Sequence, residues 1–178
     1  MTAGVTTVLR VPTAGAMREL GVRLAALLRS GDLVLLSGDL GAGKTTLTQG
    51  IGAGLGVRGD VTSPTFVIAR VHPSTVGGPA LVHVDAYRLG SLAEVDDLDL
   101  DASLDESVTV VEWGAGLVES LATDRLELAL RRPRGDDAGS GDPDGPDLDV
   151  TDLDGDQPRR VEFTAVGPRW AGVRLPGE

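Results

Sequence analysis

The sequence predicts a three-layer α/β fold with a mixed, mostly parallel central sheet, contained in a single domain that spans residues 1–178. Three observations lead to this prediction. Short apolar runs alternate with segments in which apolar residues recur at helical spacing, as expected for buried strands that alternate with helices. A glycine-rich loop joins one such strand to its helix. A chain of 178 residues is also long enough to bury a sizeable core within one domain.

The first two predicted elements are an edge strand over residues 5–10 and a helix that begins after Pro12. The Thr13 hydroxyl is suited to cap this helix, because threonine oxygens accept hydrogen bonds from backbone N–H groups of the first turn. Gly31 is expected to end the helix. Its predicted apolar face consists of Ala16, Met17, Leu20, Leu24, Leu27 and Leu28.

A phosphate-binding loop follows. Residues 33–37 form a continuous apolar run, which is typical of a buried strand. Residues 38–45 then match the motif G-x-x-x-x-G-K-[ST] in full. From Leu47 to Leu55 every fourth residue is apolar, which predicts a helix that Gly56 can end. A chance glycine-rich turn is disfavoured, because strand, loop and helix occur in the order that the motif requires.

Lys44, inside this loop, is the only lysine of the chain, and the other fifteen of the 16 basic residues are arginines. A lysine side chain can run inside a tight glycine loop, whereas the planar guanidinium of arginine is too wide. The backbone N–H groups of the loop and the positive end of the helix dipole favour an anion. Because Thr45 also offers a hydroxyl to Mg²⁺, we predict a P-loop NTPase-like fold that binds a nucleotide with magnesium.

The remaining predicted elements are strands, two short helices and a tail. Strands over residues 66–71 and 81–85 are separated by a turn, so we expect an antiparallel hairpin. Residues 91–94 match a capping box at the start of a short helix, and residues 115–121 are also expected to be helical. Further strands are predicted over 108–112, 126–130 and 160–166, with a short tail over 170–175.

The net charge of −11 is concentrated in one segment. Residues 135–157 contain nine aspartates and no basic residue, and without these nine the chain has 18 acidic and 16 basic residues. A segment this rich in Asp, Gly and Pro cannot bury enough apolar surface to become ordered, so we predict a disordered acidic insertion between two strands. The segment lacks the terminal glutamate of a calcium-binding loop, which favours a solvated loop. The chain has no basic stripe, so we expect no independent nucleic-acid binding.

Composition also excludes several classes of site. Cysteine is absent, which rules out disulfides and thiolate metal sites. No apolar run approaches 18 residues, and the N-terminus lacks a charged region followed by a long apolar stretch. We therefore expect neither a transmembrane helix nor a secretory signal, and a cytoplasmic protein.

Two carboxylates are predicted to lie beside the phosphate loop. Asp85 and Glu112 each end a buried-type strand, and the strand ends of an open α/β sheet form the crevice in which ligands bind. Either could supply an oxygen ligand to Mg²⁺, and the pattern does not decide between them. His83 alternates with the apolar positions of its strand. It either holds a neighbouring carboxylate or packs as a neutral core histidine, and we expect the latter.

Four motifs in this order resemble the TsaE (YjeE) family: residues 38–46, Ser-Pro-Thr-Phe within 62–66, His-x-Asp-x-Tyr-Arg within 83–89, and Val-Glu-Trp at 111–113. Their spacing is similar from about residue 6 to residue 130. The resemblance implies a small Mg²⁺-dependent P-loop ATPase, with weak hydrolysis on its own, that is needed for N6-threonylcarbamoyladenosine at position 37 of certain tRNAs. It implies TsaD and TsaB as partners, contact with tRNA only indirectly through their complex, and no membrane partner.

The resemblance also implies catalytic and metal-binding roles. Lys44 would hold the β- and γ-phosphates of ATP, and Thr45 and Glu112 would ligate Mg²⁺. Asp85 would assist the metal or orient the attacking water, and Thr65 would belong to a switch-like loop.

Further residues are implied at the margins of the nucleotide. Trp113 would couple the site to partners, and Thr13, at the first predicted helix, would border the adenine. The remaining expected nucleotide contacts are Asp39, Leu40, Gly41, Ala42, Gly43 and Thr46.

Three other functions compete with this interpretation. A small-molecule kinase of the P-loop class needs an acceptor pocket and a lid that excludes water, and no arginine-rich lid is evident. A GTP-dependent switch selects guanine with an Asn/Thr-Lys-x-Asp segment, for which this chain has no second lysine. A non-catalytic scaffold would bind ATP without releasing phosphate even with partners present.

If residues 135–157 are only a spacer, replacing them with a short turn should leave ATP turnover unchanged. Phosphate release by the shortened and full chains, measured side by side, checks this expectation. A large loss of activity in the shortened chain would show that the acidic segment takes part in the reaction.

Overall fold

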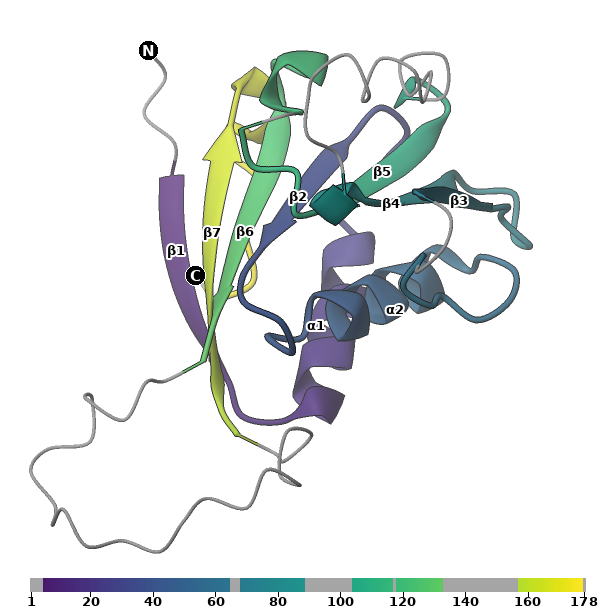
Figure 1. Ribbon diagram of the computed structural model, residues 1–178. Coiled ribbons are helices and arrows are strands. Elements are labelled where there is room, and N and C mark those ends of the chain that lie inside the picture. Colours follow the sequence, from purple (N-terminus) through teal and green to yellow (C-terminus); the bar gives the residue numbers. More distant parts are fainter. Residues whose placement is uncertain (1–4, 65–67, 89–103, 117, 133–156, 178) are drawn as a thin grey trace, which may run out of the picture.

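The computed structural model describes residues 5–64, 68–88, 104–116, 118–132 and 157–177. Its centre is a seven-stranded mixed sheet, with helices α1 and α2 packed together against one face (Figure 1). In spatial order the strands are β1 (Val5–Val11), β7 (Arg159–Val166), β6 (Arg125–Arg131), β2 (Leu33–Ser37), β5 (Ser107–Glu112), β4 (Ala80–Asp85) and β3 (Ala69–His72).

The sheet is parallel at its centre and antiparallel at both margins. Strands β6, β2, β5 and β4 run parallel to one another, whereas β7, β1 and β3 pair antiparallel with their neighbours. The predicted α/β class and mixed sheet are confirmed, with parallel pairing confined to three of the six strand pairs. The predicted β3–β4 hairpin and the edge position of β1 are also confirmed.

Helix α1 (Ala14–Ala25) begins as predicted and ends earlier than predicted. The Thr13 side chain accepts a hydrogen bond from the Ala16 N–H at 3.0 Å. The helix ends at Ala25 rather than near Gly31, because the chain turns toward β2. In that turn the Arg29 N–H donates to the Asp32 carboxylate at 2.9 Å, so the last predicted leucines lie beyond the helix.

Helix α2 (Lys44–Leu55) follows the phosphate loop directly and ends at Gly56 in a left-handed conformation, as predicted. It contacts α1 backbone to backbone. A Cβ atom on Gly50 would lie 2.1 Å from the Arg18 carbonyl oxygen, and one on Gly21 would lie 2.4 Å from the Leu47 carbonyl oxygen. Because only glycine permits this approach, the two helices fix the position of the loop that precedes α2.

The opposite face of the sheet is covered differently. In the described part of the chain, its apolar residues pack against Leu104, Val118 and the 3-10 helices η1 (Ala86–Arg88) and η2 (Glu119–Leu121). The helix predicted over 115–121 is therefore wrong apart from this short turn. Ala122 is already extended because the chain must enter β6 at Arg125, which leaves too few residues for a stable α-helix.

Several predicted features lie outside the described residues. These include the capping-box helix at 91–94, the start of the strand predicted over 66–71, and all but the last residue of the acidic segment 135–157. The 3-10 helix η5 (Pro168–Trp170) ends at Trp170, the first residue of the tail predicted over 170–175. Among the described helices, none combines the length and the apolar character needed to cross a bilayer.

The glycine contact between the helices can be tested with Gly50→Ala. Alanine favours a helix by about 0.8–1 kcal/mol, but a methyl group 2.1 Å from a backbone oxygen forces the helices apart at a larger cost. We expect a net loss of about 1–2 kcal/mol in the free energy of unfolding, measured in urea.

Gly15→Ala, in the first turn of α1, is the matched control. Its added methyl group would meet nothing closer than the Thr13 hydroxyl at 3.7 Å. This variant should gain up to about 1 kcal/mol, and equal effects at Gly15 and Gly50 would contradict the packing argument.

Candidate functional site

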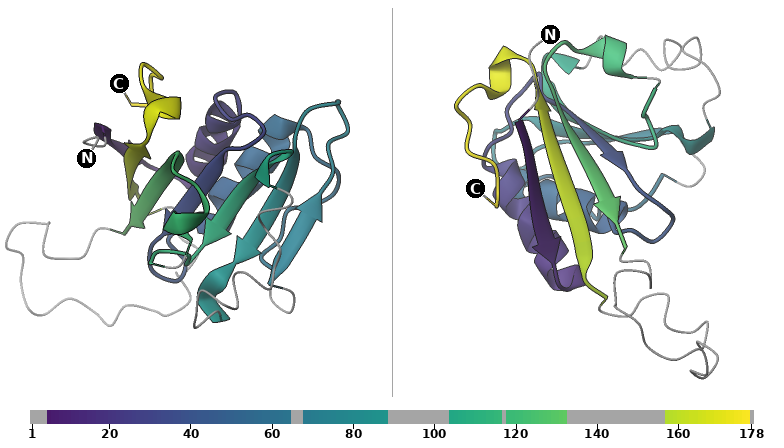
Figure 2. Two further views of the ribbon diagram at one scale, coloured as in Figure 1. Left: turned by 90° about the horizontal axis from the view of Figure 1, so that it is seen from above. Right: turned by 90° about the vertical axis from the view of Figure 1, so that its left-hand side faces the viewer.

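A cavity of about 500 Å³ opens where the ends of β4 and β5 meet the phosphate loop and the start of α1. The residues that line this cavity are far apart in the sequence: the first is Thr13 and the last is Arg159. Figure 1 and the left view of Figure 2 show the loop between β2 and α2 at this edge of the sheet. The cavity therefore lies where an open α/β sheet binds its ligands.

The loop presents an uncapped helix start. Gly43, the residue that precedes α2, is left-handed with φ 103°, and no side chain caps the N-terminus of the helix. The first N–H groups of an α-helix have no partner within the helix, and they carry the positive end of its dipole. An anion of phosphate type is therefore the ligand that fits this end of α2.

The ammonium group of Lys44 is held inside the loop. Its Nζ atom donates to the carbonyl oxygens of Gly38 at 2.8 Å and Asp39 at 3.0 Å. It also lies 3.9 Å from the centre of the Trp113 ring, a cation–π contact. Burial lowers the pKa of Lys44, and the charges of Glu112, Asp85 and Asp39 oppose that shift. The side chain is 5% exposed, so these contacts compensate the loss of hydration of a buried charge.

Glu112 is fixed between a hydroxyl and a histidine. The Thr45 hydroxyl lies 3.2 Å from its Oε1 atom, and His83 Nε2 lies 2.8 Å from the same oxygen. A carboxylate can only accept here, so Nε2 carries the proton of the imidazole. The expectation of a simple core histidine is thus corrected, because His83 is fully buried and also bonded to Glu112.

The two predicted carboxylates lie side by side, but their contacts differ. Asp85 and Glu112 are directly opposite each other in the β4–β5 pairing. Asp85 accepts a hydrogen bond from the Tyr87 N–H at 3.1 Å, whereas Glu112 is the one that contacts Thr45. The sequence did not decide which of these two carboxylates lies next to the Thr45 hydroxyl, and the geometry favours Glu112.

Trp113 has a backbone conformation that bulky residues rarely adopt. Its φ of 63° is the only left-handed value of a non-glycine residue in the described part of the chain. Such a conformation costs about 1–3 kcal/mol and persists where the surroundings impose it. Here the Trp113 N–H donates to the Leu36 carbonyl at 3.1 Å, and the ring lies between Lys44 and Tyr87, 5.4 Å from the tyrosine ring. The strained turn thus places the indole ring over the ammonium group.

The predicted site residues fall into three groups. Most of them line the cavity: Thr13, Leu40, Gly41, Gly43, Lys44, Thr45, Thr46, Asp85, Glu112 and Trp113. Ala42 is buried in the core, and Asp39 contributes its carbonyl oxygen to Lys44 from outside the cavity lining. Thr65 lies outside the described residues.

Sequence analysis missed five further lining residues: Ala14, Met17, Ser63, Tyr87 and Arg159. Ser63 and Tyr87 belong to motifs that the sequence displays, and their neighbours could have indicated them. Arg159 carries no such signal, because it reaches the cavity from β7, more than a hundred residues beyond the loop.

The donor set suits magnesium bound together with a nucleotide. Among the described residues, no group of three or more carboxylates and imidazoles gathers to hold a metal alone. Mg²⁺ usually takes one or two protein ligands and completes its shell with phosphate oxygens and water. The Thr45 hydroxyl and the adjacent Glu112 carboxylate match that requirement.

Residues 11–138 match the family model described as "Threonylcarbamoyl adenosine biosynthesis protein TsaE". A relative from Streptomyces coelicolor, named tRNA threonylcarbamoyladenosine biosynthesis protein TsaE, is 62% identical over 156 residues, which cover 87% of this chain and 94% of the relative. A protein of the same name from Bacillus subtilis is 37% identical over 147 residues, with coverages of 82% and 77%. The crystal structure of Bacillus subtilis YdiB is similar with a TM-score of 0.66 and 29% identity, covering 96% of this chain and 93% of that one.

The contact between His83 and Glu112 predicts a measurable coupling. His83→Leu leaves the buried Glu112 carboxylate with only the Thr45 hydroxyl as a donor, so it should lower the free energy of unfolding by about 2–3 kcal/mol. In the double variant with Glu112→Gln, the charge is gone and much of the loss should be recovered. Urea unfolding of the two single variants and the double variant gives the coupling, and strictly additive effects would show that the contact contributes nothing.

Proposed function

The chain belongs to the TsaE family, and from this membership we propose that it is the ATP-binding and ATP-hydrolysing component of the machinery that makes N6-threonylcarbamoyladenosine at position 37 of tRNA. A role in the biosynthesis of threonylcarbamoyladenosine in tRNA follows from the family itself. The observation that carries the ATPase part of the proposal is the uncapped start of α2 around Lys44, with Thr45 against Glu112 on the adjoining wall.

In this proposal the loop binds the β- and γ-phosphates. The amides at the start of α2 and the Lys44 ammonium donate to phosphoryl oxygens, exchanging the carbonyl contacts of Lys44 for stronger charged ones. Charge develops on these oxygens as the terminal phosphoryl group is transferred to water. Donors that are already oriented before the reaction lower its barrier most effectively, which favours a loop fixed by packed helices.

Thr45 and Glu112 would hold Mg²⁺, while His83 keeps the Glu112 carboxylate in one orientation. When bound, Mg²⁺ supplies positive charge that neutralises the phosphate oxygens. Asp85 is half-buried in the same cavity wall and does not contact Thr45, so it is available to orient the attacking water. Thr13 and Met17, at the start of α1, would border the adenine.

TsaD and TsaB are the proposed partners, in a cytoplasmic assembly. Tyr87 is 71% exposed and its ring contacts Trp113, so a partner that covers Tyr87 would also affect the ring above Lys44. This contact gives the coupling role proposed for Trp113 a physical route. Hydrolysis by the isolated chain is therefore expected to be weak, since the partner would complete the site.

Nucleotide binding is the first test. At ATP concentrations of a hundred times the dissociation constant, Mg-ATP should stabilise the chain by about 2.7 kcal/mol, visible as a shift in thermal unfolding. Lys44→Ala should abolish the shift. Lys44→Arg should abolish it too, because the guanidinium keeps the charge but does not fit the loop. A full shift in either variant would contradict the proposed site.

Hydrolysis is the second test, measured as phosphate release with Mg-ATP in the presence of TsaD and TsaB. Glu112→Gln should reduce the rate by about a hundredfold or more, as expected when a group that holds charge at the reacting phosphate is lost. Glu106→Gln, an exposed carboxylate before β5, removes the same charge elsewhere and should leave the rate unchanged. Equal rates in the Glu112 variant and the unaltered chain would refute the assignment.

A further inference from the structure

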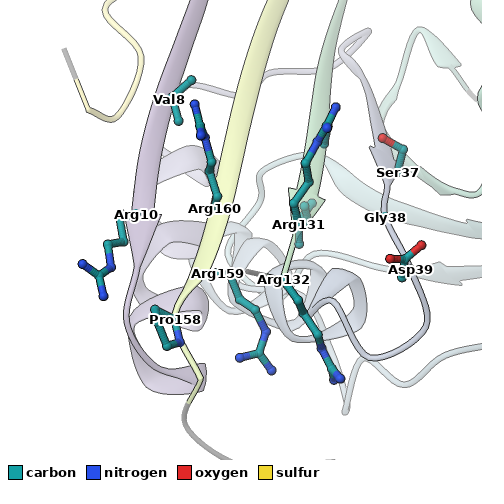
Figure 3. A pocket seen from close by; sticks show the side chains of 12 residues that line it. Val8, Arg10, Ser37, Gly38, Asp39, Arg131, Arg132, Pro158, Arg159 and Arg160 are labelled. Carbon is teal, nitrogen blue, oxygen red and sulfur yellow. The ribbon is translucent and has the colours of Figure 1, made fainter. Parts of the chain in front are cut away.

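A second cavity, of about 950 Å³, lies between the phosphate loop and the antiparallel margin of the sheet (Figure 3). Ser37, Gly38 and Asp39 line it at the loop, and five arginines in or next to β1, β6 and β7 line it at the margin. One of these arginines, Arg132, directly follows β6, and Figure 3 shows its side chain extended toward the loop. The loop is therefore approached by a residue that the phosphate-binding motif does not include.

Arg132 holds the loop through a backbone oxygen. Its Nε atom donates to the Gly41 carbonyl oxygen at 3.1 Å, and its terminal Nη2 atom donates to the same oxygen at 2.6 Å. Hydrogen bonds from an ionised donor are stronger than those between neutral groups. Because both donors belong to one planar group, they fix the direction of the carbonyl as well as its distance. The Gly41 peptide group is thereby tied to the end of β6, across 91 residues of sequence.

Gly41 provides the room for this contact. The phosphate-binding motif requires glycine at positions 38 and 43, whereas position 41 accepts any residue. Gly41 has a left-handed φ of 73°, and a Cβ atom on it would lie 2.4 Å from the Arg132 Nη2 atom. The other two nearest atoms to that Cβ atom also belong to the Arg132 guanidinium. The absence of a side chain at Gly41 thus permits the contact with Arg132 as well as the backbone turn.

The contact acts on a turn that is closed within the loop. The Gly41 carbonyl and the Ala42 N–H belong to one planar peptide group, in which they point in opposite directions. That N–H donates to the Asp39 carbonyl oxygen at 3.0 Å, and the same oxygen accepts from Lys44 Nζ. Arg132 therefore holds one side of a peptide group whose other side closes the turn. Fixing this group keeps residues 39–42, and the ammonium bonded to them, in one arrangement.

We propose that Arg132 is a positioning residue for the nucleotide, which keeps the phosphate loop in the conformation that accepts the phosphates. The inference rests on the proposed function, in which this loop binds ATP. Gly41 lines the nucleotide cavity and, within the described part of the chain, Arg132 does not, so the guanidinium acts through the loop. A loop that is already ordered loses less conformational entropy when the nucleotide binds. Arg132 should therefore influence the affinity for the nucleotide more than the rate of phosphoryl transfer.

Calorimetric titration of the full chain with Mg-ATP tests the effect on affinity. Arg132→Gln removes the guanidinium with both hydrogen bonds to Gly41, and it should raise the dissociation constant about tenfold. Arg132→Lys keeps the charge but lacks the planar fork, so it should raise the constant by about threefold or more. Arg131→Gln is the matched control, because this exposed neighbour carries the same charge, and its effect should stay below about twofold.

Steady-state hydrolysis with TsaD and TsaB separates affinity from chemistry. In Arg132→Gln the KM for Mg-ATP should rise about tenfold while kcat stays within about twofold of the unaltered chain, as expected when ground state and transition state lose the same binding. A lower kcat at an unchanged KM would contradict the proposed role, since Arg132 would then act on the reaction itself.

A second variant removes the same contact from the side of the loop. The methyl group of Gly41→Ala would displace the guanidinium, and alanine is also strained in a left-handed conformation. In this background the contact is already lost, so adding Arg132→Gln should change the dissociation constant by less than about twofold. Multiplicative effects of the two substitutions would show that Arg132 acts by a route other than Gly41.

Hydrogen exchange of the nucleotide-free chain tests the loop without ATP. The backbone amides of residues 38–44 should exchange about fivefold faster or more in Arg132→Gln, because a loop that is held less firmly opens more often. Arg131→Gln should leave their exchange unchanged, and the amides of residues 47–55 in α2 serve as a reference for an intact fold. Unchanged exchange of the loop in Arg132→Gln would overturn the proposal whatever the affinity for ATP.

The outcomes separate this inference from the proposed function. Absence of Mg-ATP binding by the unaltered chain would contradict the proposed function, and loop exchange would still decide whether Arg132 orders the loop. Normal binding by the unaltered chain with an unchanged dissociation constant in Arg132→Gln would overturn the role of Arg132 alone. Equal weakening by the Arg131 and Arg132 variants would show a general charge effect, and tighter binding by Arg132→Gln would show that the contact opposes the nucleotide.

Discussion

The buried ammonium group of Lys44 is the interaction on which the surrounding structure depends. A charge that is 5% exposed is stable only where hydrogen bonds and opposite charges replace its hydration. Two loop carbonyls, the Trp113 ring and the neighbouring carboxylates supply that replacement. The left-handed turn at Trp113 and the bond from His83 to Glu112 then have a common explanation, since each holds a group near Lys44 or Thr45 in place.

The two parts of the sheet serve this arrangement in different ways. The parallel centre brings the ends of β2, β4 and β5 to one edge, which is where the loop and the carboxylates meet. Helix α2 is held there by its backbone contact with α1 at Gly21 and Gly50, so the loop rests on a rigid support. The antiparallel margin brings strand ends with arginines next to the same loop, and Arg132 and Arg159 connect the two regions.

Local sequence was sufficient for three features that depend on neighbouring residues. The phosphate loop, the Thr13 cap and the end of α2 at Gly56 involve contacts within a few positions, and the structure has each of them as expected. Predictions failed where a later element determined the outcome. Helix α1 ends before Gly31 because Asp32 bonds back to Arg29, and the segment 115–121 is too short for an α-helix because the chain must reach β6. Strand-ending positions also identified Asp85 and Glu112, which line the cavity.

By itself, then, the sequence determined the fold class, the loop with its solitary lysine and the pair of acidic residues beside it. Tertiary structure alone decided that Glu112 contacts Thr45, that His83 bonds to Glu112, that the Trp113 ring covers Lys44, and that five arginines gather on one margin. The physical reason is strand register. Which side chains meet across a sheet depends on how segments tens to hundreds of residues apart align, and no local periodicity encodes that alignment.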